Sequence, residues 1–168
     1  MGDTMFGIGQ SENDAIEMLK KDHKEVDTLF DEYESKKEKS KPADKSRIAK
    51  LVCRALSVHA AIEEEIFYPA VRKQSEETKK LVDEAAVEHQ SLKDIIGRLE
   101  SASPSDPLYD AGMKVLSEYV KHHVKEEEGE LFPKVRASGI DLEALGQRMK
   151  ARKTQLEGAP ARSLRSAA

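Results

Sequence analysis

The sequence has no tryptophan, a single cysteine and few aromatic residues, which make up 5% of its 168 residues. The lone cysteine, Cys53, excludes a disulfide within the chain and fits a reducing compartment. No apolar run approaches the roughly 20 residues that a membrane-spanning helix needs. The N-terminus lacks the basic segment followed by an apolar one that marks a secretory signal. We therefore expect a cytoplasmic protein that does not insert into a membrane.

Strong positive charge is also missing. The 28 Lys and Arg residues are outnumbered by 32 Asp and Glu residues, and the basic residues form no patch in the body of the chain. Nucleic acid is therefore not an expected partner. The sequence is instead rich in Leu, Ala, Glu and Lys, which favour helices. Its length fits one compact domain, and we expect a monomer or a weak oligomer.

Apolar residues recur every three or four positions over four long segments, and no segment shows the alternation of a strand. The segments span about 14–36, 43–69, 76–100 and 108–133. A polar loop at 101–107 separates the last two, and a short helix is expected over 141–152. This pattern predicts an all-α fold, an up-down-up-down four-helix bundle with a short C-terminal helix. The bundle domain is predicted to span 11–153, between a flexible arm at 1–10 and a disordered tail at 154–168.

Histidines take positions in the apolar stripes of these helices. His23 lies in the first stripe, His59 in the second and His89 in the third, and the pair His122-His123 follows at the matching place on the fourth. The chain has only five histidines, so every histidine lies at one of these positions. On the fourth segment the stripe is assigned to Leu108, Gly112, Val115 or Leu116, and Tyr119.

The two halves of the chain resemble each other. LSVHAAIEEEIFYP at 56–69 and VKHHVKEEEGELFP at 120–133 both contain His-x-x-x-Glu-Glu, followed by an apolar residue, an aromatic residue and proline. The upstream segments DHKEVDTLF and EHQSLKDII are similar as well. Aligned in this way, the halves pair His23 with His89, His59 with His123, and Glu63 with Glu127.

His and Glu four positions apart lie on one face of a helix, with about 5–6 Å between their Cβ atoms. Four such helices facing inward bring four imidazoles and two carboxylates to one level of the core. Burying these carboxylates without a cation would cost several kcal/mol. Nitrogen and oxygen ligands together favour Fe, Mn or Zn over Mg or Ca. The predicted metal ligands are His23, His59, Glu63, His89, His123 and Glu127.

Three further residues are candidates for an alternative ligand or for a contact to one. His122 is an alternative to His123. Tyr119 precedes His123 by one turn, and is either a core residue or a group that ligates a metal or donates to a bound oxygen species. Lys93 follows His89 by one turn, and either extends to solvent or faces the site, where its charge would favour an anion. A second set of acids is expected to be solvated or to contact the ligands: Glu64, Glu65, Glu126, Glu128 and Glu130.

The order His…His-x-x-x-Glu…His…His-x-x-x-Glu resembles the hemerythrin-like, or HHE cation-binding, family over roughly residues 11–135. The resemblance implies a four-helix bundle around a non-haem di-iron centre with bridging carboxylates, with Zn or Mn as alternative metals. The chain departs from the oxygen-carrying hemerythrins, which have a second histidine four residues after the one on the third helix. Lys93 stands at that position here.

This departure argues against simple reversible O2 carriage. The ligand set is similar to that of bacterial HHE proteins linked to O2, nitric oxide or peroxide, and to the di-iron domain of iron–sulfur repair proteins. We expect a di-iron protein that binds or senses O2 or NO. Alternatives are a di-iron enzyme that decomposes peroxide, an iron store or donor for iron–sulfur repair, and a helical interaction module that needs no metal. Whether the chain is an enzyme, and which redox partner it has, stay open.

Overall fold

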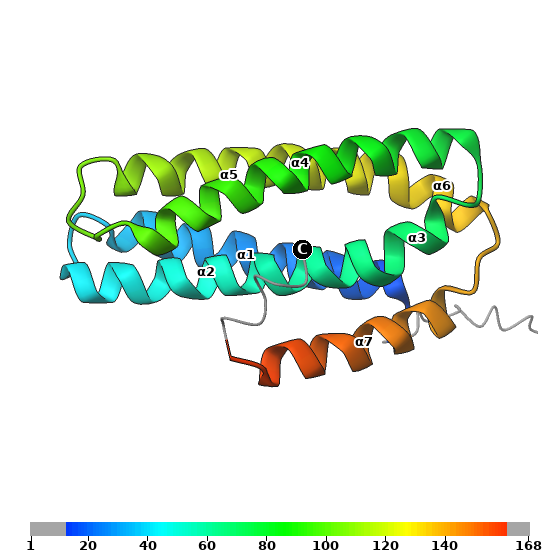
Figure 1. Cartoon of the computed structure of the whole chain (residues 1–168), viewed down its shortest axis with the longest axis horizontal. Coiled ribbons are helices and arrows are strands. Elements are labelled where there is room, and N and C mark those ends of the chain that lie inside the picture. The colour runs from blue at the N-terminus through cyan, green and yellow to red at the C-terminus, as the bar shows by residue number, and fades with distance from the viewer. Residues whose placement is uncertain (1–12, 161–168) are drawn as a thin grey trace, which may run out of the picture.

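Four long helical segments run antiparallel to one another in the computed structural model, which describes residues 13–160 (Figure 1). The segments are α1 (Ala15–Lys36); α2 (Pro42–Ile62) with the π-helix η1 (Glu63–Phe67) and α3 (Tyr68–Val71); α4 (Glu76–Ser101); and α5 (Tyr109–Glu126) with the π-helix η2 (Glu127–Leu131) and α6 (Phe132–Ala137). A further helix, α7 (Leu142–Gly158), lies outside them. The predicted bundle with a C-terminal helix is confirmed. None of the described helices is long and apolar enough to cross a membrane.

Polar side chains fix where three of these helices begin. The carboxylate of Asp14 accepts from the backbone N–H groups of Ile16 and Glu17 at the start of α1. Ser75 and Thr78 form a reciprocal capping box at the start of α4, and Asp141 caps α7. Each cap satisfies N–H groups that have no partner within their helix. The capping residues therefore set the register in which each apolar stripe enters the core.

The fourth segment buries a different stripe from the predicted one. Its buried positions include Tyr109, Met113, Leu116, Val120 and His123. The predicted residues Leu108 and Tyr119 are 75% and 49% exposed. The observed stripe continues at a spacing of three or four residues through His123 to the buried Glu127. The predicted stripe was therefore out of register by one residue over most of its length.

Prolines lie just after both π-helices, and neither ends its helical segment. The fourth segment was expected to span to residue 133, but the chain continues in a helix through Pro133 to Ala137. The backbone N–H groups of Tyr68 and Phe132 donate to the carbonyls of Glu63 and Glu127, five residues earlier. A proline has no N–H to donate, and its ring clashes with the carbonyl four residues before it. The wider turn of a π-helix just before the proline accommodates the ring. Both π-helices begin at a predicted carboxylate ligand.

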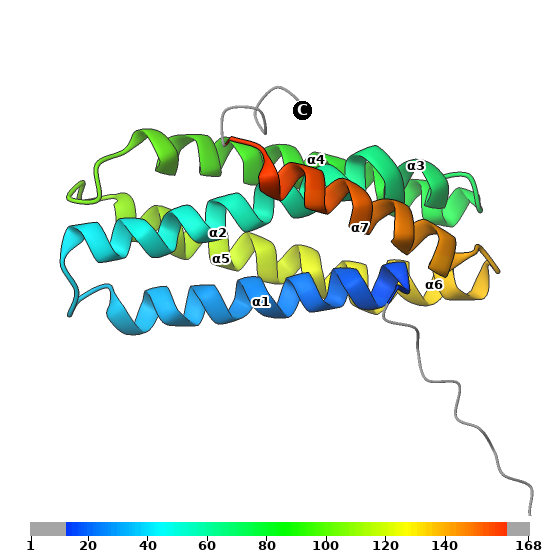
Figure 2. The same cartoon turned by 90° about the horizontal axis from the view of Figure 1, so that it is seen from below.

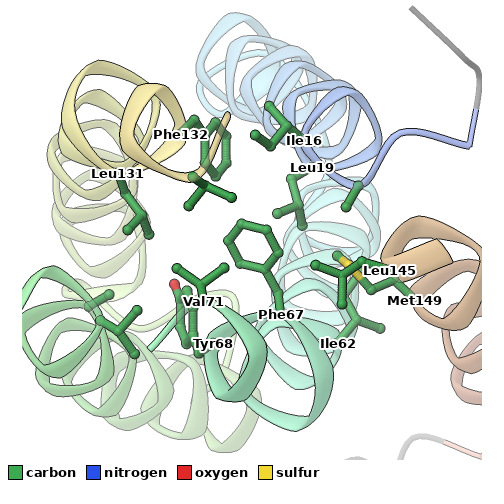
Figure 3. Packing of buried hydrophobic residues seen from close by; sticks show 14 of the residues in the cluster. Ile16, Leu19, Ile62, Phe67, Tyr68, Val71, Leu131, Phe132, Leu145 and Met149 are labelled. Carbon is green, nitrogen blue, oxygen red and sulfur yellow. The ribbon is translucent and has the colours of Figure 1, made fainter. Parts of the chain in front are cut away.

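Two hydrophobic clusters fill the bundle, one on each side of the level at which the histidines lie. The first cluster is built around Phe67 and Phe132, whose ring centroids are 5.9 Å apart and nearly perpendicular (Figure 3). The second includes Val26, Phe30 and Leu116. The clusters hold the helices together above and below a polar layer, which positions the polar side chains between them.

Helix α7 packs against α1, α2 and η1, on the side away from α4 and α5 (Figures 1 and 2). Its Leu145 and Met149 enter the first cluster. The helix continues to Gly158, past the end expected at residue 152, because its last turn buries Leu156 and meets no helix breaker before the glycine. The expected arm at 1–10 and the part of the expected tail after residue 160 lie outside the described residues.

Gly146 lets α7 approach the start of α1 closely. A Cβ atom added there would lie 1.8 Å from the carbonyl oxygen of Asn13 and 2.8 Å from the amide nitrogen of Ala15. Because both neighbours are backbone atoms, Gly146→Ala should lower the free energy of unfolding by about 1–3 kcal/mol. Urea unfolding measures this change.

Gly97, in the interior of α4, is the matched control for this substitution, because nothing lies within 4 Å of its added Cβ. Gly97→Ala should stabilise the chain by about 0.5–1 kcal/mol, since alanine loses less backbone entropy in a helix. A Gly146→Ala variant that gained stability in the same way would show that α7 does not dock on α1 as described.

Candidate metal centre

All six predicted ligands lie in the polar layer between the two hydrophobic clusters, and each is at most 7% exposed. Four helices and both π-helices supply them: His23 from α1, His59 from α2, Glu63 from η1, His89 from α4, His123 from α5 and Glu127 from η2. Their ligand atoms form two groups in which all atoms lie within 4.8 Å of one another.

The first group joins His23, His59, Glu63 and Glu127. The Nε2 atoms of His23 and His59 are 3.2 Å apart. His59 Nε2 is 3.2 Å from Glu63 Oε1, and His23 Nε2 is 3.2 Å from Glu127 Oε2. Ligand atoms that bind one ion at about 2.0–2.2 Å and at right angles lie about 3 Å from each other. The spacing in this group therefore suits a shared ion.

The second group joins Glu63, His89 and His123. The Nε2 atoms of the two histidines are 3.2 Å apart, and His89 Nε2 is 3.3 Å from Glu63 Oε2. Glu63 thus presents Oε1 to one pair of histidines and Oε2 to the other. Glu127 is less evenly placed between the two groups, because its Oε2 lies 3.2 Å from His23 Nε2 and 3.7 Å from His123 Nε2. The arrangement suits two ions with Glu63 between them.

Each of the four histidines has a carboxylate at its outer nitrogen, Nδ1. The pairs are His23 with Glu128 at 2.7 Å, His59 with Asp22 at 3.4 Å, His89 with Glu64 at 2.9 Å, and His123 with Glu88 at 2.6 Å. A carboxylate that accepts from Nδ1–H orients the ring and directs Nε2 inward, which is how metal-binding histidines are commonly held. Contacts of Glu64 and Glu128 with the site were among the expectations, whereas those of Asp22 and Glu88 were missed. A signal for the missed pair exists, because each directly precedes an inward-facing histidine in the sequence.

Sequence reasoning also missed Tyr68. Its hydroxyl lies 3.1 Å from Glu127 Oε1, 3.4 Å from Glu63 Oε2 and 3.3 Å from His89 Nε2. Burial raises its pKa well above the ordinary value, and the two carboxylates raise it further, so the hydroxyl keeps its proton. The sequence did contain a signal for Tyr68. At this position the two halves of the chain differ, because Tyr68, which has a hydroxyl group, aligns with Phe132, which has none.

The other three candidates fall in different places. Tyr119 is 49% exposed, so it is not a core residue. The side chain of His122 is 62% exposed and lies outside both inner groups. Lys93 reaches the outer layer of the site, since its Nζ lies 2.6 Å from Glu64 Oε2 and Glu64 contacts His89.

Two buried carboxylate oxygens test whether the residues fit a metal. Among the described residues, Glu63 Oε1 and Glu127 Oε2 have no hydrogen-bond partner. A buried acceptor without a partner costs about 1–3 kcal/mol, and more when it is charged. Both atoms face imidazole nitrogens at metal-ligand spacing, and the set of nitrogen and oxygen donors suits Fe, Mn or Zn. The residues therefore fit a metal centre.

Without a metal, protonated His59 and His89 supply positive charge beside Glu63. Burial lowers the pKa of His59, but the negative charge of Glu63, together with the hydrogen bond and charge of Asp22, outweighs burial and raises it to about 10. Burial likewise opposes the charge on His89, yet hydrogen bonds to Glu63 and Glu64 raise its pKa to about 9. The same pairs hold the pKa of Glu63 well below its ordinary value despite its burial.

The metal-free chain should therefore lose stability in alkaline solution. A histidine whose pKa is raised by folding stabilises the fold fully below its unfolded pKa of about 6.5, and this contribution is lost as the pH rises through the folded value. For His89 and His59 the loss falls at about 9 and 10. Urea unfolding of the chelator-treated chain between pH 7 and pH 10 measures it. The metal-loaded chain is the control, and an equal loss in both forms would contradict the prediction.

The sequence pattern of the Hemerythrin HHE cation binding domain matches residues 14–135, which is most of the chain. The chain belongs to the hemerythrin HHE cation-binding family. The crystal structure of an HHE domain protein from Mycobacterium kansasii has a TM-score of 0.70 and 26% sequence identity, over 86% of this chain and 88% of that one. The predicted family is thus confirmed, and with it a cation-binding domain whose fold places His and Glu side chains in clusters.

Two curated relatives are similar to this chain over different shares of their length. An uncharacterized protein of Mycobacterium tuberculosis is 29% identical over 114 residues, which are 66% of this chain and 68% of that protein. A DNA nickase of Nostoc is 27% identical over 155 residues, which are 90% of this chain. This chain spans only 42% of the nickase, less than half of that protein's length.

Proposed function

We propose that this HHE domain holds two iron ions and binds a small oxidant, O2 or NO, beside them. One observation carries the proposal: Glu63 presents one carboxylate oxygen to each of two histidine pairs. His23 and His59 would hold one ion, and His89 and His123 the other. Iron bound there supplies electrons that zinc cannot supply. Because six protein ligands are shared between two ions, coordination positions are left for a small molecule.

A small cavity next to the four histidines supports a diatomic ligand. Its volume is about 30 Å³, enough for one small molecule. Apart from the histidines, most of its lining is apolar: Val26, Leu56, Ala60, Leu92, Ile96, Val120 and Val124, with Asp22, Ser57 and Lys93. A pocket of this size and polarity favours a neutral molecule such as O2 or NO over a larger or strongly hydrated one.

Metal content and ligand response together test this proposal. Protein purified without chelator should contain about two iron ions per chain by elemental analysis. Addition of O2 or NO to the reduced protein should change its absorption spectrum, and the change should persist without consumption of further ligand. A fully folded protein that contains only zinc, or no metal, would overturn the proposal.

Decomposition of peroxide is the second candidate, and the position of Tyr68 favours it. Cleavage of an O–O bond requires protons, and Tyr68 keeps its hydroxyl proton, with the hydroxyl oxygen 3.1 Å from Glu127 Oε1 and 3.4 Å from Glu63 Oε2. If peroxide is consumed catalytically, Tyr68→Phe should slow consumption by about 100-fold and leave the iron content unchanged. Tyr33→Phe is the matched control, because Tyr33 is also buried but donates to Asp110, away from the centre. An iron-loaded protein that leaves peroxide untouched would exclude this activity.

A further inference from the structure

A third group of possible metal ligands lies at the surface between α4 and α5. It consists of Glu88, His122 and Glu126, whose ligand atoms lie within 4.8 Å of one another. His122 Nε2 is 3.4 Å from Glu88 Oε1 and 3.3 Å from Glu126 Oε1. The His122 side chain is 62% exposed, so an ion in solution can reach this group.

The outer group is joined to the inner centre by one side chain and one cavity. Glu88 uses its other oxygen, Oε2, to accept from His123 Nδ1 at 2.6 Å. A cavity of about 20 Å³ lies beside this contact. It is lined by Glu84, Glu88, Glu126, Glu127 and His123, together with the apolar residues Leu81, Ala85 and Leu131. Four carboxylates of this lining, Glu127 of the inner centre among them, can therefore attract a cation between the exposed group and the inner ligands.

The first half of the chain has apolar side chains at three of the four equivalent positions. Aligning the two halves places His122 on Val58, Glu126 on Ile62 and Glu84 on Met18. Val58 and Ile62 are buried in the cluster that also contains Leu145 and Met149 of α7, and Met18 packs against that cluster. Helix α7 covers only the α1–α2 side of the bundle (Figures 1 and 2). Glu88 aligns with another acid, Asp22, but His122, Glu126 and Glu84 have polar counterparts nowhere in the half that α7 covers.

We propose that Glu88, His122 and Glu126 form an outer site for a divalent transition-metal ion, from which the ion moves along the carboxylate-lined cavity to the inner centre. One imidazole and two carboxylates suit Fe²⁺, Mn²⁺ or Zn²⁺. Three protein ligands at the surface hold an ion more weakly than the shared buried set, so transfer runs inward. Binding at the outer site stands on its own, whereas the transfer step rests on the proposed function.

Titration of the metal-free full chain with Mn²⁺, followed by the paramagnetic resonance of the free ion, counts the sites. The wild type should bind three ions, and the double variant His122→Ala/Glu126→Gln should bind two. When Fe²⁺ is added without oxygen, the variant should fill the inner centre to the same final level about tenfold more slowly, because charge that concentrates ions at the opening has been lost. Glu130→Gln, which removes an exposed acid from the same segment, should bind three ions and load at the wild-type rate.

Equal ion counts and equal loading rates in wild type and double variant would overturn the proposal. Circular dichroism should show the same helix content in both, because His122 and Glu126 are not part of the core. The wild type could instead bind a single ion that the double variant does not bind, while the inner groups hold no metal. That outcome would support the outer site. That result would overturn both the transfer step and the proposed function, so the two failures are distinguishable.

Discussion

Removal of the metal should lower the midpoint of thermal unfolding by about 8–16 °C. An ion that binds only the folded chain stabilises it by about 4 kcal/mol when its free concentration is a thousand times the dissociation constant. For a domain of this size each kcal/mol shifts the midpoint by about 2–4 °C. The ligands come from four helices that are distant in sequence, so the unfolded chain cannot present them together.

The metal-free chain should nevertheless remain helical below its lower midpoint. The raised pKa values of His59 and His89 mean that imidazolium groups face Glu63 at neutral pH, so its charge is not left without a partner. Thermal scans of one sample before chelation, after chelation and after reloading with Fe²⁺ measure the effect, and reloading controls for irreversible damage. An unchanged midpoint after complete chelation would indicate that the histidines serve the fold alone.

The sequence predicts the fold and the inner ligands for the same physical reason. A helix buries residues at a spacing of three or four, so histidines at stripe positions on four helices must meet if the stripes meet. The repeated His-x-x-x-Glu then places His59 with Glu63 and His123 with Glu127. The stripe of the fourth helix was predicted incorrectly because the exposed face of this helix also has apolar residues at helical spacing, including Val115 and Tyr119. Only packing against the other helices distinguishes the two stripes.

The supporting residues were harder to predict because they contact histidines on other helices. Asp22 holds His59 and Glu64 holds His89, and which acid meets which ring depends on how the helices are rotated against each other. The sequence contains 32 acidic residues, most of which look alike without that rotation. Tyr68 was missed for a related reason, because it lies beyond a π-helix that shifts the register of the residues after it.

Substitution of Glu63 by glutamine should release both ions. Its two oxygens face different histidine pairs, so the loss of one carboxylate weakens both groups at once. Glutamine keeps the shape, but it has no charge and replaces one oxygen by an NH₂ group, which cannot bind a cation. Affinity for both ions should fall by more than about 100-fold, since even residues that only support ligands contribute about 10–100-fold. Elemental analysis after dialysis against a weak chelator measures the retained metal.

Two comparisons make this result specific. Glu65→Gln changes a neighbouring acid in the same π-helix that pairs with Arg152 on the surface, so it should retain both ions. Glu127→Gln should release chiefly the ion held by His23 and His59, because Glu127 belongs to the first group and lies farther from His123. A Glu63→Gln chain that kept one tightly bound ion would show that Glu63 serves a single group. The two histidine pairs would then be independent sites, and a di-iron centre bridged by Glu63 would be wrong for this chain.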